Sequence, residues 1–456
     1  MKSRPNSQSA GNKNDAGKRM PPQKDLIGRR TFITSSLATL ALLPACSSNS
    51  TYSFVSSPEK LARFKQDRFC ISFWVGPPAD AQMGKHYAQL AAANFTVVMG
   101  GFGADTPETD RRQQLDLCGK YGLKALVYLS GYEAGAIHGP ADNGQIKQAD
   151  KFPNHPACWG YMLHDEPSAL LFPNLRYMVN YLRRARPGKL GYINLFPNYA
   201  SAAQLGARSY EEYVSRFVRE VNPDVLCMDY YPMMEPHANS QDGYCANLAV
   251  LRTYALQRSI PFWNYFNAMP FGGHSDPTEA QMRWQINTSL AYGAKGVLYF
   301  CYWTPGGFRH GGALISAAGR PTRHYDQARR INAKLKNLGP TLMQLTSEAV
   351  HRIPRGANPA TALKGSPLKS ITPGDYLIGV YKHTDGRAAV LLNNYSWAYA
   401  AWPTVEFAAN LKNIVEVDPD TGREIPVADA SPNMPGLQIS LGAAEGRLFL
   451  IPQSSQ

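Results

Sequence analysis

The sequence is poor in cysteine, and the few cysteines form no metal-binding pattern. Of seven in 456 residues, none lies in a CxxC or Cys/His spacing. Cys46 stands alone near the N-terminus, whereas Cys70, Cys158, Cys227 and Cys301 fall within apolar runs. A buried thiol behaves as a small hydrophobic group. We therefore expect free thiols in a folded core, with no metal ion and no cofactor.

Long apolar runs are also missing. A transmembrane helix needs about 20 apolar residues, and the stretch from Thr31 to Ala45 is too short and too rich in Ser and Thr to span a membrane. It follows the twin arginine Arg29 and Arg30, which is typical of an export signal. Residues 1–46 are therefore predicted to be a signal that is removed, and not a domain.

The end of this segment predicts an attachment to lipid. The tetrapeptide from Leu43 to Cys46 resembles a bacterial lipoprotein cleavage site, which would leave Cys46 as an acylated N-terminus at a membrane surface. Ser47 follows, and by the same resemblance this favours the outer membrane, facing the periplasm. The alternative is a soluble periplasmic protein in which Cys46 is incidental.

No run of Lys and Arg with interleaved aromatic residues is present, which argues against a nucleic-acid partner. The formal net charge is +13. Removal of residues 1–46 takes away eight basic and two acidic residues and leaves about +7. This remaining charge favours acidic partners or an anionic polysaccharide.

About 410 mature residues exceed one ordinary domain, and the composition changes near residue 345. We predict a tether over 47–65, a barrel over 66–345 and a second domain over 346–456. In the barrel region, short apolar runs alternate with helix-like segments. The predicted strands are Phe69 to Val75, Phe95 to Met99, Ala125 to Leu129, Trp159 to Leu163, Leu190 to Leu195, Val225 to Met228, Phe262 to Phe266 and Gly296 to Tyr302.

Strands that are apolar throughout belong to a parallel sheet covered on both faces, and eight strand-helix units close into a (β/α)₈ TIM barrel. An open doubly wound sheet would usually carry a Gly-rich phosphate turn after its first strand, and Gly76-Pro77-Pro78 is not one. The predicted helices are Ala79 to Ala93, Glu108 to Tyr121, Asn174 to Arg186, Tyr210 to Val221, Ala246 to Arg258, Thr278 to Tyr292 and His324 to Leu338.

The C-terminal region contains short strands separated by turn sequences such as Thr384-Asp385-Gly386, which predicts a small antiparallel β-sandwich. The expected strands are Tyr376 to Tyr381, Ala389 to Asn393, Thr404 to Phe407, Ile414 to Val417, Leu437 to Leu441 and Arg447 to Ile451.

In a (β/α)₈ barrel the active site lies at the C-terminal ends of the strands, so polar and aromatic residues at those ends are functional candidates. They are Trp74 (strand one), Ser130, Tyr132 and Glu133 (three), His164, Asp165 and Glu166 (four), Asn194 (five), Asp229, Tyr230 and Tyr231 (six), Asn264 and Asn267 (seven), and Tyr302 and Trp303 (eight).

Carboxylates thus gather after strands four and six, with aromatic residues around them. Glycosidic bond cleavage uses two carboxylates, and flat aromatic faces stack on sugar rings. A single aromatic residue at the barrel rim more often packs under a loop. The prediction of sugar chemistry therefore depends on the whole set of carboxylates and aromatic residues. His164 and Glu166 are of residue types that bind metal ions, but no further His has a suitable spacing.

Three segments carry a resemblance to a known group: Trp159 to Pro167, Asp224 to Pro232 and Gly293 to Trp303. They resemble glycoside hydrolase barrels, especially the family-42-like β-galactosidases, and the segment from Val417 to Gly422 is similar to the C-terminal sandwich of those enzymes. The resemblance implies a (β/α)₈ barrel followed by a sandwich, and an oligo- or polysaccharide as the partner.

By this resemblance Glu166 is the general acid, and Trp303 is the aromatic residue of strand eight. The sequence departs from the group at strand seven, where the nucleophilic Glu is expected but Phe262 to Met269 holds no carboxylate. It also has Asp165 where an Asn usually precedes the acid. Asp229 is therefore the candidate for the second carboxylate.

Two alternatives stay open for these residues. In a substrate-assisted reaction like that of chitinase-like barrels, Asp165, Glu166 and Tyr230 would hold an N-acetyl group as the internal nucleophile. In the other interpretation, Asp165 only caps the helix after Pro167. The missing carboxylate at the end of strand seven is also compatible with a different class of protein, a non-catalytic, surface-anchored sugar-binding protein. The residues assigned to substrate binding are Trp74, Asn194, Tyr230, Tyr231, Asn264, Asn267, Tyr302 and Trp303.

Overall fold

The computed structural model describes residues 62–100, 108–128, 154–235, 239–306, 312–429 and 431–452. The predicted signal, Cys46, most of the tether and the candidates Ser130, Tyr132 and Glu133 lie outside these ranges. Within them, no helix has both the length and the apolar character that crossing a membrane requires.

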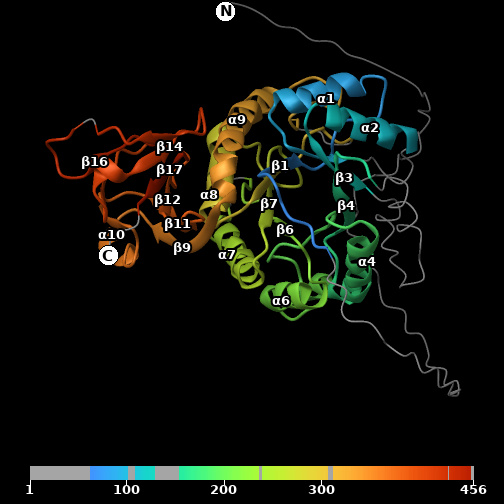
Figure 1. The fold of residues 1–456 in the computed structure, drawn as a ribbon, viewed down its shortest axis with the longest axis horizontal. Helices are drawn as coiled ribbons and strands as arrows, with labels where there is room; N and C mark the ends of the chain where they lie inside the picture. The colour runs from blue at the N-terminus through green and yellow to red at the C-terminus, as the bar shows by residue number, and fades with distance from the viewer. Residues whose placement is uncertain are drawn as a thin grey trace, which may run out of the picture. The chain divides into compact units, whose positions relative to one another are not determined.

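Eight parallel strands close into the predicted barrel (Figure 1). They form two hydrogen-bonded sets in the orders β2-β3-β4-β5 and β1-β8-β7-β6. The amide of Thr96 donates to Ile71 O at 3.0 Å between β1 and β2, and Leu195 pairs with Met228 between β5 and β6. The strands are β1 (Cys70–Phe73), β2 (Val97–Gly100), β3 (Lys124–Tyr128), β4 (Cys158–Asp165), β5 (Leu190–Asn194), β6 (Leu226–Asp229), β7 (Phe262–Asn267) and β8 (Gly296–Phe300).

Helices surround this barrel and cover its outer surface (Figure 1). Each predicted helix is present, with bounds that shift by a few residues; α9 is longer than predicted because it continues through Pro340. The helices are α1 (Met83–Ala92), α2 (Glu108–Lys120), α4 (Phe172–Ala185), α5 (Ala202–Leu205), α6 (Tyr210–Glu220), α7 (Gln241–Arg258), α8 (Glu279–Ala291) and α9 (Arg323–Met343).

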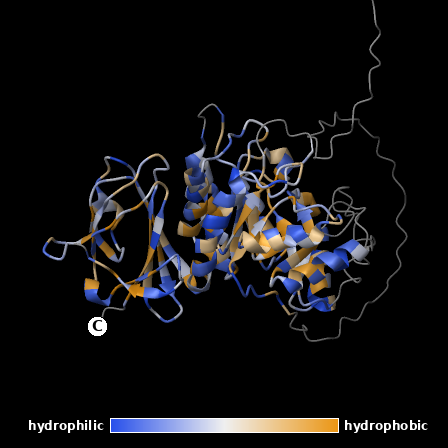
Figure 2. Ribbon diagram, turned by 90° about the horizontal axis from the view of Figure 1, so that it is seen from above, coloured by the Kyte–Doolittle hydropathy of each residue, from blue (hydrophilic) through white to orange (hydrophobic). Residues whose placement is uncertain are grey.

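Alternate residues of each strand face the inside of the barrel, because successive side chains of a strand point to opposite faces. The interior is filled by aromatic side chains: the Trp263 ring stacks on Trp159 and on Tyr192, with centroids 5.8 Å apart in both pairs. Outward residues such as Phe73 and Tyr299 pack beneath the helices. Figure 2 shows apolar residues concentrated on the strands and on the helix faces turned toward them.

The C-terminal region is a sandwich of two antiparallel sheets, with the orders β15-β14-β17-β12-β11-β9 and β10-β13-β16. Its core is a separate apolar cluster that includes Ile378, Val390, Val405 and Phe449. The strands are β9 (Leu345–Ile353), β10 (Leu368–Ile371), β11 (Tyr376–His383), β12 (Ala388–Asn394), β13 (Thr404–Phe407), β14 (Val415–Val417), β15 (Glu424–Pro426), β16 (Leu437–Gln438) and β17 (Gly446–Ile451).

Helix α8 of the barrel packs against the sandwich. The Tyr381 hydroxyl of β11 donates to Leu290 O at 2.6 Å, and Asn287 Nδ2 donates to Ala444 O at 2.8 Å. The ring of Trp284 also packs against Tyr395 and Trp397 at 5.2 and 5.3 Å. The sandwich thus rests on a barrel helix through both apolar and hydrogen-bonded contacts.

A buried ion cluster lies at the base of the barrel, just before β6. The Asp224 carboxylate is almost inaccessible to solvent, and its Oδ1 accepts from Arg183 at 2.6 Å and from Arg63 at 2.7 Å. Its Oδ2 accepts from the amide of Phe64 at 3.3 Å. Asp224 therefore ties the segment that precedes β1 to α4 and to the start of β6.

Candidate active site

Two of the predicted carboxylates share one amide group. Asn194, the last residue of β5, donates from Nδ2 to Asp165 Oδ1 at 3.0 Å and to Asp229 Oδ1 at 3.1 Å. Asp165 ends β4 and Asp229 ends β6, so three neighbouring strands bring these side chains together at the C-terminal end of the barrel. Because one nitrogen reaches both, the two Oδ1 atoms lie within about 6 Å of each other.

Burial in this position disfavours the ionised forms of both carboxyls. It raises the pKa of Asp165 to about 6, against the lowering effect of the Asn194 hydrogen bond. Burial, together with the nearby charge of Asp165, raises the pKa of Asp229 to about 8. Two coupled carboxyls with separated pKa values hold one proton between them near pH 7. The arrangement therefore supplies one acid and one carboxylate at neutral pH.

Tyr231 connects this pair to an aromatic wall. Its hydroxyl is hydrogen-bonded to Asp229, which favours the ionised carboxylate. Its ring contacts Phe271 at 5.0 Å, Phe300 at 5.1 Å and His274 at 5.7 Å. The wall thus combines Phe300 of β8 with residues from the segments that follow β6 and β7.

Glu166 directly follows β4 and has an uncommon backbone conformation. Its φ angle is +47°, in the left-handed region that non-glycine residues seldom adopt. Its amide donates to Asn194 O at 2.9 Å, which fixes the segment against β5. The carboxylate is half-buried and acts electrostatically on buried Tyr213. A strained residue at a strand end of a barrel is a functional candidate.

Asp165 does not cap the segment after Pro167. The N-cap of the short 3₁₀ helix η1 (Ala169–Leu171) is Ser168, whose hydroxyl accepts from the Leu170 amide. The Asp165 side chain instead receives the Asn194 hydrogen bond described above. Of the two interpretations of Asp165, the geometry agrees with a place in the site.

Three predicted binding residues lie away from this pair. Asn264 is fully buried between β7 and the helices, where its Nδ2 donates to Tyr244 at 2.6 Å and to Ser289 at 3.0 Å. The Tyr302 ring packs on Phe73 at 4.9 Å in the layer outside the barrel. Tyr230 also faces outward, with its ring 5.6 Å from Tyr244. The structure therefore does not bring Asn264, Tyr302 or Tyr230 into the interior with the carboxylates.

The other candidates occupy the rim. Asn267 at the end of β7 is buried, and its Oδ1 accepts from the amide of Met233 at 3.3 Å. The Trp74 ring lies 6.1 Å from the inward-facing Tyr265. The Trp303 ring is 5.0 Å from His86 of α1 and contacts no group of the carboxylate pair in the part of the chain described. Asn267 and Trp74 are thus nearer to the interior than Trp303.

Phe271, Phe300 and His274 are site residues that the sequence analysis did not single out. Phe300 could have been found from strand alternation, because it lies two residues after the inward-facing Leu298 on β8. Phe271 and His274 come from a glycine-containing loop, whose conformation the residue pattern does not predict. Among the described residues, no group of His, Cys, Asp and Glu is arranged to hold a metal ion.

No protein-family model and no curated protein matches the chain. Among solved structures it is similar to a catalytic mutant of a GH42 β-galactosidase from G. stearothermophilus, with 9% identity over 86% of this chain and 100% of that one, at a TM-score of 0.58. It is also similar to β-galactosidase from the psychrophilic Marinomonas ef1, with 12% identity at a TM-score of 0.45. That match spans 59% of each chain, so under two thirds of the Marinomonas enzyme's length. The likeness to the GH42 structure shows the fold: this chain has the (β/α)₈ barrel that its sequence predicts.

Proposed function

We propose that the protein is a glycoside hydrolase that cleaves an O-glycosidic bond of a periplasmic or extracellular glycan. The observation that carries this proposal is the Asp165-Asn194-Asp229 arrangement at the C-terminal end of the barrel. Glycoside hydrolysis needs one protonated and one ionised carboxyl at opposite sides of the reacting bond. The raised pKa of each carboxyl supports one of each at neutral pH.

In this proposal Asp229 gives its proton to the leaving glycosidic oxygen, and ionised Asp165 faces the anomeric carbon. The upper limit of about 6 Å between their Oδ1 atoms lies below the about 6.5–9.5 Å that inverting enzymes need to admit a water between the carboxyls. It favours attack by Asp165 itself, followed by hydrolysis of the glycosyl-enzyme. Asn194 holds the two carboxyls in place.

Glu166 is the second candidate for the proton donor. The resemblance to family-42-like barrels assigns it this role, and its strained backbone at the end of β4 supports a functional position. The two assignments predict different variants to be inactive. Loss of activity in Glu166→Gln with normal activity in Asp229→Asn would move the acid role to Glu166.

The pH dependence of hydrolysis tests the proposal. We expect kcat/KM to follow a bell-shaped curve, with activity falling below pH about 6 and above pH about 8. The acidic limb appears because Asp165 must be ionised, and the basic limb because Asp229 must keep its proton. Initial rates with a panel of nitrophenyl glycosides across pH 4–10 give the two limbs.

A non-catalytic sugar-binding protein is the rival function. It is favoured by the end of β7, where buried Asn267 stands in place of a carboxylate. This function predicts measurable affinity for glycans, no turnover of any glycoside in the panel, and no effect of Asp229→Asn. Turnover that depends on Asp229 would eliminate it.

We also propose that the protein is exported and held by lipid at Cys46. In a cell that acylates lipoproteins, the parent chain is expected in the membrane fraction and to incorporate labelled palmitate. Replacing Cys46 with serine removes the acylated thiol, so the variant is expected in the soluble fraction without label. Ser47→Ala is the control and should keep the label. A labelled or membrane-bound Cys46→Ser variant would contradict the anchor.

A further inference from the structure

A cavity of about 580 Å³ lies at the base of the barrel, at the opposite end from the carboxylate pair. Its walls come from the segment before β1, the C-terminal end of α7, the residues before β7 and β8, and the start of β9. The volume falls in the range of small-molecule sites, about 300–1,000 Å³. The cavity is therefore lined by both the barrel and the first strand of the sandwich.

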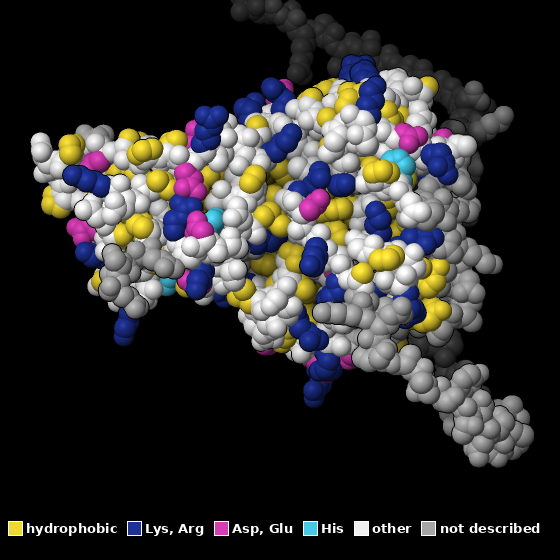
Figure 3. All heavy atoms as spheres, in the orientation of Figure 1, with side chains coloured by type: hydrophobic (Ala, Val, Ile, Leu, Met, Phe, Trp, Pro, Cys, Tyr) yellow, Lys and Arg dark blue, Asp and Glu magenta, His cyan; other side chains and the backbone are white. Residues whose placement is uncertain are grey.

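The charges around this cavity are strongly unbalanced. Among the described residues its lining holds a single carboxylate, Asp224, which is already paired with Arg63 and Arg183. The same face of the molecule carries many Lys and Arg side chains over the barrel and few Asp or Glu (Figure 3). The cationic side chains of the lining are Arg63, Lys65, Arg252, Arg258 and Lys295.

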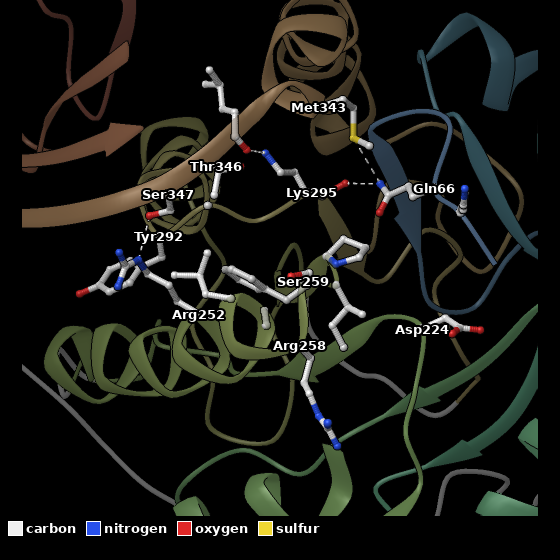
Figure 4. A pocket seen from close by; sticks show the side chains of 18 of the residues that line it. Gln66, Asp224, Arg252, Arg258, Ser259, Tyr292, Lys295, Met343, Thr346 and Ser347 are labelled. Carbon is white, nitrogen blue, oxygen red and sulfur yellow. Dashed lines mark hydrogen bonds between the residues drawn. The ribbon is translucent and has the colours of Figure 1, made fainter. Parts of the chain in front are cut away.

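Arg252 and Lys295 are the half-buried cations of the lining, and neither has a carboxylate partner among the described residues. Arg252 Nε donates to Ser347 Oγ at 2.8 Å. Lys295 Nζ donates to the backbone oxygens of Leu342 and Leu345. In Figure 4 Arg252 lies with Tyr292 and Ser347 on one side of the cavity, and Lys295 lies on another, while Arg258 points away.

Both cationic groups lose hydration because they are partly buried. Burial lowers the pKa of Lys295 to about 7, and it also lowers the pKa of Arg252. A partly desolvated cation without a counter-charge is unfavourable, and an anion placed nearby would offset that loss. The remaining N–H groups of the Arg252 fork suit the two oxygens of a carboxylate or phosphate.

The rest of the lining is apolar. Leu256 is 38% exposed, although large aliphatic side chains usually avoid water. Ile260, Pro261 and Met343 are also only partly buried, and they line the same cavity. An inorganic ion would leave this surface uncovered, whereas an organic anion with an apolar body would cover it.

We propose that this cavity binds a small organic anion, with its carboxylate or phosphate at Arg252 and its apolar body against Leu256, Ile260 and Met343. The site is separate from the proposed glycosidase site and does not depend on that function. Because the anion would contact Arg252, whose Nε is bonded to Ser347 of β9, its binding would stabilise the junction of barrel and sandwich.

Isothermal titration of the mature protein with phenyl phosphate and benzoate tests the proposal, with benzyl alcohol as the uncharged probe. Both anions are expected to bind and to raise the thermal unfolding midpoint, and benzyl alcohol is expected to do neither. Binding should weaken with added salt, because the attraction is electrostatic. Benzyl alcohol binding as tightly as benzoate would overturn the proposal.

Leu256→Glu places a negative charge in the cavity at an exposed helix position, so the variant is expected to fold. It should lower the affinity for phenyl phosphate at least tenfold. Leu170→Glu is the matched control, because Leu170 is 79% exposed and does not line the cavity. Arg252→Met should weaken binding in the same way. Equal affinities of the parent, Leu256→Glu and Arg252→Met proteins would overturn the proposal.

Discussion

Replacing Asp229 with asparagine is expected to lower kcat/KM for glycoside cleavage by about 10²–10⁴-fold, the usual contribution of a general acid or base. Asparagine has nearly the same shape and still accepts the Asn194 hydrogen bond through its side-chain oxygen, but it cannot give up a proton. The pH profile of the residual activity should lack the basic limb. Initial rates with the best glycoside of the panel, measured across pH, give both results.

Stability measurements distinguish this loss of chemistry from a loss of fold. The pKa of Asp229 is about 8 in the folded protein, against about 3.9 for an unfolded aspartate. The folded state therefore binds more protons between pH 4 and 8, and stability falls as pH rises through this range. Asparagine removes this dependence, so Asp229→Asn should be more stable than the parent at pH 8.

Asp326→Asn is a suitable control, because Asp326 lies in α9 and is exposed, with Arg329 3.5 Å away. It should leave kcat/KM and its pH profile unchanged. Full activity of Asp229→Asn at neutral pH would remove Asp229 from the mechanism. Equal losses in Asp229→Asn and Asp326→Asn would show that the effect is not specific to the site.

The largest expected loss of stability comes from Asp224→Asn at the base of the barrel. Removing one member of a buried ion pair leaves its partner's charge uncompensated, which typically costs about 3–5 kcal/mol. Here the guanidinium of Arg183 would be left, since its side chain is only 4% exposed. The midpoint of urea unfolding, followed by circular dichroism, should fall accordingly.

Asp326→Asn also serves as the control for this result. Exposed ion pairs contribute about 0–1 kcal/mol, so its unfolding midpoint should stay near that of the parent. Catalytic activity of folded Asp224→Asn at low temperature should be retained, because Asp224 lies at the opposite end of the strands from Asp165 and Asp229. An unfolding midpoint equal to that of the parent would contradict the role assigned to the ion cluster.

Most of the barrel could be predicted from the sequence because its strands are apolar on both faces. A run such as Leu190 to Asn194 is buried throughout, so its composition alone indicates a covered parallel strand. The sandwich strands β9, β10 and β15 were not predicted. In β9, charged and polar residues such as Glu348 and Arg352 are mixed with apolar ones without strict alternation, and the strand is recognisable only through its pairing with β11.

The positions of the candidate residues at strand ends could be predicted from the sequence, but the directions of their side chains could not. Asn264 and Asn267 lie on the same strand, and an odd spacing of three residues places them on opposite faces. The inward-facing Trp263 and Tyr265 would have assigned Asn267 to the interior and Asn264 to the helix layer. The bond from Asn194 to both aspartates depends on the curvature of three strands, which no local pattern contains.

The ion cluster around Asp224 also determines where a mechanical load would enter the protein. Residues 62–64 meet the barrel at its base, where Arg63 binds Asp224 and Ala62 O accepts from the Gly188 amide at 3.4 Å. For a chain held at its N-terminus by lipid, as proposed, the contacts of Ala62 and Arg63 are the first in the described part of the chain that a pull from the envelope would load. The carboxylates lie at the far end of the strands, so such a force would strain the base before it disturbed their spacing.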